Sequence, residues 1–208
     1  MGNPCGNTQI RLGLPRPTWM TLALIIACCA IFIAMAASDA GKYYLNTYLR
    51  LGVDTQVQVW RLITFQFLHA NPSHLLWNMV GLYFFGPPLE RTLGRWKFLA
   101  FYLVCGVIAG MCFLALAQWY PYNRLVGASG GIFGCLMGCA ILFPDMIVLI
   151  FPIRWVTAFL VLLYGLSIWW APRGSFTEAA HLGGMVAAAG CQTRRNSNAA
   201  SLRTSITK

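Results

Sequence analysis

Six apolar stretches, separated by polar segments, occupy most of the chain. They cover residues 18–38, 74–88, 96–119, 128–144, 153–171 and 177–192. Their lengths and their scarcity of charged side chains are typical of helices that cross a lipid bilayer. The pattern therefore predicts an all-α, polytopic membrane protein with six transmembrane helices.

The segments outside these spans differ in character. Residues 39–73 form a long, aromatic-rich link, and we expect its tyrosines and Trp60 to lie at the membrane–water boundary. Within it, residues 60–69 are apolar but are separated from the next span by Asn71-Pro72, which predicts an interfacial segment. The tails 1–17 and 193–208 are polar and lack apolar periodicity, so we expect both to be unfolded. The six-span domain then covers residues 18–192.

The composition supports a membrane protein. Hydrophobic residues make up 58% of the chain and charged residues 10%, against roughly 45–50% and 25% in soluble domains. So few charges cannot cover that much apolar surface, and the excess is expected to face lipid. All cysteines except Cys5 fall inside the apolar stretches, where cysteine behaves as a small hydrophobe. We therefore expect neither a disulfide framework nor a metal site.

The net charge of +10 bears on how the protein is oriented in the membrane. Basic residues at the ends of apolar segments set membrane sidedness, so we do not expect a nucleic-acid partner. The tails and the links after the second and fourth spans hold Arg11, Arg16, Arg91, Arg95, Lys97, Arg154, Arg194, Arg195, Arg203 and Lys208. The opposite face holds only Lys42, Arg50, Arg61, Arg124 and Arg173. This asymmetry predicts that both termini are cytoplasmic.

The second, fourth and sixth spans are expected to be short. About 16 residues at 1.5 Å each give roughly 24 Å, less than the roughly 30 Å hydrocarbon core. If their inner ends reach the cytoplasmic interface, their outer ends stop within the membrane. Irregular backbone at that depth needs protein or water around it, which predicts a cavity open to the outside.

The outer ends of these three spans carry polar residues. The second span begins with His74 and Asn78, the fourth contains Ser129 between glycines, and the sixth contains His181. A serine hydroxyl becomes a good nucleophile when an imidazole accepts its proton, and a helix N-terminus can stabilise a nearby oxyanion. His74 and Asn78 lie one helical turn apart and can point donors at the same oxygen.

Taken singly, each of these residues also has a structural explanation. A serine between glycines commonly serves helix packing, a lone histidine can lie neutral in a core, and His74 with Asn78 can cap a helix. Their common depth on three separate spans favours a shared chemical role. The glycine stripes, with Gly130, Gly134 and Gly138 on one span and Gly184 with Ala188 on another, predict close helix contacts.

These residues form an ordered set that resembles the rhomboid family of intramembrane serine proteases. The matching motifs are Trp60-Arg61, His74-x-x-x-Asn78, Glu90-x-x-x-Gly94, Gly127-x-Ser129-Gly130 and Ala180-His181-x-x-Gly184. The resemblance implies a six-helix rhomboid-like bundle in which Ser129 is the nucleophile and His181 its base, without an acidic third member. It also implies an oxyanion hole of His74, Asn78 and the Ser129 backbone N–H, and no metal or cofactor.

The resemblance extends to less central positions. Some relatives have tyrosine four residues after the serine, packed on the histidine, where this chain has Phe133. Glu90 and Trp60-Arg61 match positions that look structural, and we expect Glu178 to face the loop before the sixth span. The implied substrates are single-span membrane proteins within the bilayer, cut near its outer side after the fifth span moves to admit them. We expect a bacterial cytoplasmic membrane.

Other functions agree less well with the residues present. A zinc protease would require His-Glu-x-x-His, which is absent from the sequence. An aspartyl protease would require two aspartates within spans, and the aspartates of this chain lie in links or at span ends. A transporter would show internal repeats. The remaining alternative is a catalytically silent rhomboid-like protein that binds membrane clients, which would be expected to have lost Ser129 or His181.

Overall fold

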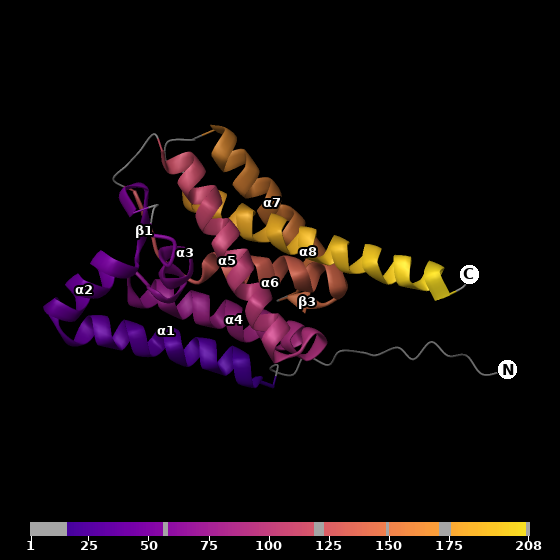
Figure 1. Ribbon diagram of the computed structural model, residues 1–208, viewed down its shortest axis with the longest axis horizontal. Helices are drawn as coiled ribbons and strands as arrows, with labels where there is room; N and C mark the ends of the chain where they lie inside the picture. Colours follow the sequence, from indigo (N-terminus) through magenta and orange to yellow (C-terminus); the bar gives the residue numbers. More distant parts are fainter. Residues whose placement is uncertain (1–15, 56–57, 119–122, 149, 171–175, 207–208) are drawn as a thin grey trace.

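A computed structural model describes residues 16–55, 58–118, 123–148, 150–170 and 176–206. The N-terminal tail up to residue 15 and the expected span ends at 119 and 171 lie outside the described residues. The α-helices of the described part are α1 Trp19–Ala37, α2 Asp39–Leu49, α3 Arg61–Thr64, α4 Pro72–Leu93, α5 Arg95–Ala117, α6 Ser129–Leu142, α7 Ile153–Trp170 and α8 Phe176–Ile206 (Figure 1).

Short elements complete the described chain. Two 3₁₀ turns, η1 Val53–Thr55 and η2 Phe65–Phe67, flank α3. Strand β1 Leu51–Gly52 pairs antiparallel with β2 Arg124–Leu125, and β3 Ile147–Val148 pairs with β4 Phe151–Pro152. The first pair joins the link after α2 to the link before α6, and an ion pair between Asp54 and Arg124 at 2.7 Å reinforces it.

The centre of the bundle is α6, enclosed by α4, α5 and α8. Its glycines explain this position. A Cβ on Gly130 would collide with Ala109 of α5, one on Gly134 would lie 2.5 Å from Cys105, and one on Gly184 of α8 would overlap the Gly130 carbonyl. The close helix contacts expected from the glycine stripes are therefore confirmed, and they bring the α6 and α8 backbones together.

Within the described residues, three helices, α1, α5 and α7, are long and apolar enough to cross a membrane, and α6 is apolar but shorter. Helix α7 lies at the edge of the bundle and packs mainly on α8 and α6 (Figure 1). Most of its exposed side chains are large and apolar, as a lipid-facing surface requires, among them Trp155, Phe159, Leu162 and Trp169. The polytopic all-α class is confirmed, and the count of six spans stays a prediction.

Two predicted helix ends are wrong. Helix α4 continues through Pro87 and Pro88 to Leu93, because Leu89 and Glu90 beyond the prolines are buried in tertiary contacts that offset the lost backbone hydrogen bonds. Helix α8 continues past residue 192 to Ile206, so the segment 193–206 is helical and not an unfolded tail (Figure 1). Of the three spans expected to be short, only α6 is short as a helix.

Glu90 explains how α4 holds α1. Its carboxylate accepts hydrogen bonds from the backbone N–H groups of Met20 and Thr21, at 2.9 and 2.8 Å, and from the hydroxyls of Thr18 and Thr21. These N–H groups belong to the first turn of α1, where a helix offers no carbonyl acceptor for them. Glu90 thus caps α1, and the start of α1 lies beside the end of α4.

Trp60 and Arg61 cap the opposite kind of helix end, the C-terminus of α2. Arg61 donates to the carbonyls of Thr47 and Arg50, at 2.6 and 2.8 Å, and the Trp60 indole donates to that of Tyr48. These carbonyls lie in the last turn of α2 and at Arg50, the residue that follows it, where a helix leaves its carbonyls without partners. Both motifs expected to be structural therefore have a structural role.

The apolar segment 60–69 lies mainly against protein. Phe65, Gln66 and His69 are almost fully buried, although Trp60 is half-exposed. The Gln66 side chain contacts α5 where Gly106 leaves room for it. The expectation of an interfacial segment is wrong for these buried residues, because glycines of α5 leave room for them: Gly106 for Gln66 and Gly110 for Phe65.

Candidate active site

Ser129 is the first residue of α6. The Ile132 N–H is bonded to the Ala128 carbonyl at 3.1 Å, so the N–H groups of residues 129–131 precede the first intrahelical bond. Gly127 and Ala128 precede this turn, and Gly127 has a φ of 127°, a conformation that favours glycine. This turn directs the Ser129 side chain toward α8, and Ser129 is half-buried.

The base expected for Ser129 lies next to it. Nε2 of His181, in the second turn of α8, is 2.9 Å from the Ser129 Oγ. This contact depends on the close approach of the two helices at Gly130 and Gly184. With Nε2 as acceptor, the imidazole is in position to take the hydroxyl proton.

Two aromatic rings enclose the imidazole. The Phe133 ring lies 4.3 Å from the His181 ring, between ring centroids, and the Tyr164 ring of α7 lies 5.2 Å from it. The two aromatic rings also meet each other edge to face at 5.5 Å. The expected stacking of Phe133 is present. Tyr164 was not predicted, because nothing in the sequence of α7 indicates which of its side chains faces α8.

His74 lies beside the serine turn. A Cβ on Gly127 would lie 2.8 Å from the Nε2 of His74 and 3.8 Å from the Ser129 Oγ, so both side chains border the space that glycine leaves. The His74 Nδ1 is 3.4 Å from the backbone N–H of Ala70, which can donate to it. His74 is half-buried and its ring directs Nε2 toward the serine turn.

Asn78 has a partner in its own helix. Its Nδ2 donates to the His74 carbonyl at 2.8 Å, and the residue is 7% exposed. A primary amide nitrogen carries two hydrogens, so one remains after this bond. The structure thus brings Ser129, His181 and His74 together, with Asn78 one turn further along α4.

Other titratable side chains take no direct part. The Nδ1 of His181 and the Oε2 of Glu178 are both buried without a hydrogen-bond partner in the described part of the chain, so Glu178 does not form a triad with His181. Glu178 was expected to face the loop, whereas this oxygen is buried. Burial, with a smaller effect of His74, lowers the pKa of His69 to about 4, and its ring is neutral at pH 7.

Comparison with known proteins identifies a family. The rhomboid domain model matches residues 56–193, which include Ser129, His181, His74 and Asn78. The matched segment covers most of the chain.

Several named relatives are similar. Rhomboid protease GlpG of Pectobacterium atrosepticum is 28% identical over 178 residues, covering 80% of this chain and 59% of the relative. Putative rhomboid protease YdcA of Bacillus subtilis is 45% identical over 75 residues, covering 36% of this chain and 37% of the relative. Rhomboid protein 1, mitochondrial, of Saccharomyces cerevisiae is 36% identical over 157 residues, covering 68% of this chain and 43% of the relative. The chain spans less than two thirds of each of these relatives' length.

Proposed function

The chain belongs to the rhomboid family, and we propose that it is an intramembrane serine endopeptidase that cleaves single-span membrane proteins with a Ser129–His181 dyad. The observation that carries the proposal is the 2.9 Å contact between the Ser129 Oγ and the His181 Nε2, at the N-terminus of a helix. Nucleophile, base and backbone donors then meet at one point. The reaction requires no metal or cofactor.

In the first step the Ser129 Oγ attacks the scissile carbonyl while His181 accepts the hydroxyl proton on Nε2. His181 then gives this proton to the leaving amine, and an acyl-enzyme remains on Ser129. A water molecule, deprotonated by the same nitrogen, attacks the ester, and the proton returns to Ser129. The Phe133 and Tyr164 rings keep the imidazole oriented in place of an acidic third residue.

The tetrahedral intermediate carries a negative oxygen that needs donors. We assign this role to the Ser129 backbone N–H, the His74 ring and the remaining Nδ2 hydrogen of Asn78. The N-terminal dipole of α6 acts in the same direction. His74 donates in this scheme only when its proton is on Nε2, which agrees with the Ala70 N–H approaching Nδ1.

We place the site near the outer side of a cell membrane with both termini in the cytoplasm. The cap between Glu90 and α1 supports a common end for the start of α1 and the end of α4, where Arg16, Arg91, Arg95 and Lys97 gather. Helix α6, 14 residues long, measures roughly 21 Å, so a Ser129 at its outer end lies below the membrane surface. Substrate entry then involves movement of α7, the edge helix beside His181.

A catalytically silent, client-binding rhomboid-like protein is the alternative. Such a protein has no need for a nucleophile and base in hydrogen-bond contact, and both residues are retained here. The dyad geometry therefore favours the protease.

The full-length protein, purified and reconstituted with a fluorescently labelled single-span substrate, tests the proposal. We expect cleavage by the unchanged protein and loss of nearly all turnover in Ser129→Ala and His181→Ala, because the two side chains act as a unit. Thermal unfolding in detergent should show that both variants still fold. Normal turnover by folded Ser129→Ala protein would end the serine-protease assignment.

A further inference from the structure

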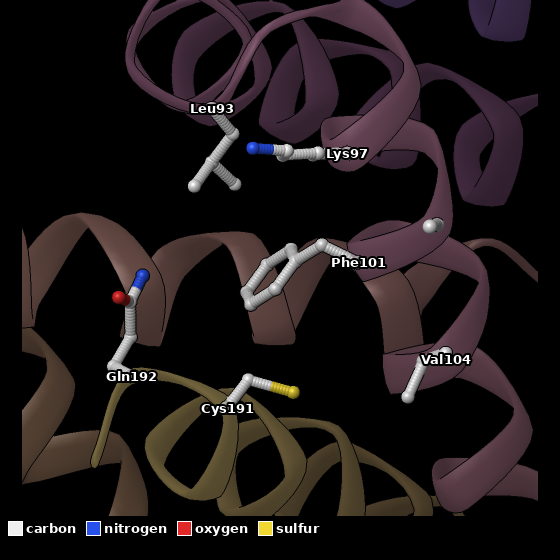
Figure 2. A pocket seen from close by; sticks show the side chains of 7 residues that line it. Leu93, Lys97, Phe101, Val104, Cys191 and Gln192 are labelled. Carbon is white, nitrogen blue, oxygen red and sulfur yellow. The ribbon is translucent and has the colours of Figure 1, made fainter. Parts of the chain in front are cut away.

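A groove lies at the end of the bundle remote from Ser129, between α5 and the part of α8 near residue 191. It has a volume of about 280 Å³, and its walls include Leu93, Lys97, Phe101, Val104, Cys191 and Gln192. Figure 2 shows the Phe101 ring in its middle and the Lys97 amine beside Leu93 at one edge. The lining combines one cationic group with an otherwise mostly apolar surface.

The positions along α5 explain this division. Lys97, Phe101 and Val104 follow one another at helical spacing, so they share one face of α5. Lys97 lies in the first turn of α5, close in sequence to Arg91 and Arg95, and Val104 is about two turns further along the helix. Val104 is 43% exposed, so this face continues onto the lipid-facing surface of the bundle.

The charge at the groove's edge has no counterpart in the described residues. Among the described residues, the ion pairs join Arg124 with Asp54 and Arg154 with Asp145, and neither pair involves Lys97. The first turn of α5 also contains no acidic side chain. A ligand with an anionic head group and an apolar tail would complement both the Lys97 amine and the apolar walls of the groove.

We propose that this groove binds an anionic phospholipid, with its phosphate at Lys97 and the upper part of one acyl chain along Phe101 and Val104. The volume of about 280 Å³ is just below the roughly 300–1,000 Å³ of small-molecule sites, which suits part of one acyl chain. A basic pocket between transmembrane helices at the cytoplasmic side is the kind of surface that recognises acidic lipid headgroups. The proposal rests on the proposed membrane orientation and does not depend on proteolysis.

Native mass spectrometry of the full-length protein, released from detergent with added phosphatidylglycerol or phosphatidylcholine, measures the binding. We expect a retained phosphatidylglycerol adduct and weaker retention of phosphatidylcholine. Lys97→Gln should reduce phosphatidylglycerol retention about fivefold. Lys42→Gln, which removes one exposed charge from α2, is the matched control and should leave retention unchanged.

A second measurement locates the lipid. Cys191 is exposed and lines the groove, so alkylation by N-ethylmaleimide, mapped on its peptide, reports occupancy. We expect phosphatidylglycerol to slow this alkylation, and Val104→Trp, which fills the groove, to abolish the lipid effect. Equal retention of the two lipids, an unchanged adduct in Lys97→Gln, or lipid-independent alkylation of Cys191 would each overturn the proposal. So would protection of Cys191 that accompanies dimer formation and needs no lipid.

Discussion

His74 and Asn78 differ from the dyad in the effect expected from their loss. In the proposed mechanism they touch only the oxyanion, whose charge develops in the transition state, so their removal should lower kcat more than it raises KM. His74→Ala or Asn78→Ala is expected to reduce kcat by about 10²–10³ and to leave measurable activity. Steady-state kinetics with a reconstituted substrate checks this. Full turnover in both folded variants would remove the oxyanion role from α4.

Tyr164 contacts the proposed base, and the sequence did not indicate it. Its ring contacts both His181 and Phe133, so we expect it to restrict the rotation of the imidazole. Tyr164→Leu removes the ring, and misplacement of His181 should lower kcat by about ten- to a hundredfold with little change in KM.

Tyr164→Phe is the matched variant, because it keeps the ring and loses only the hydroxyl. It should retain most of the activity if ring contact is the relevant property. Equal loss in the phenylalanine and leucine variants would assign the effect to the hydroxyl, and an effect on KM alone would place Tyr164 in substrate binding.

At the scale of elements, the distance between α6 and α8 decides whether the dyad can form. Gly184 and Gly190 both lie on α8, yet a Cβ on Gly184 would overlap the Gly130 carbonyl, whereas one on Gly190 meets no atom within 4 Å. Gly184→Ala should therefore destabilise the protein by about 1–3 kcal/mol through overpacking.

Gly190→Ala is the control within the same helix. It should be neutral or stabilising by about 0.5–1 kcal/mol, since alanine restricts the unfolded chain and favours the helix. Thermal unfolding in detergent, with turnover measured alongside, compares the two variants. We expect only Gly184→Ala to lose activity, because it pushes Ser129 away from His181. Equal melting temperatures would show that the helix contact tolerates a methyl group.

For the whole molecule, the proposed orientation predicts where substrates are cut. An extended backbone is needed for attack, because helical hydrogen bonds shield the scissile carbonyl. Substrates should therefore have helix-weakening residues such as Gly or Pro in the outer part of their span, with small residues at the cleavage site. Mass spectrometry of the products should locate cleavage there, and replacing those residues with leucine should slow it. Cleavage at the cytoplasmic end of the substrate span would contradict the orientation.

The sequence alone carried the information that is local or compositional. Apolar stretches predicted the membrane-embedded helical class, and the ordered motifs predicted which residues lie near Ser129, since their types follow from the chemistry of acyl transfer. Glycine stripes predicted close helix contacts, because a missing Cβ is visible in the sequence itself. These inferences needed no knowledge of which helices are neighbours in space.

The tertiary structure decided what depends on partners distant in the chain. Helix α4 continues beyond Pro88 because Glu90 binds the first turn of α1, a contact across about 70 residues that no local propensity reveals. Tyr164 joins the site because α7 packs on α8. The groove at Lys97 likewise has walls from α5 and α8, two helices that are distant in the chain. Helix propensity is a property of neighbours in sequence, whereas burial and contact depend on packing, so only the folded chain determines them.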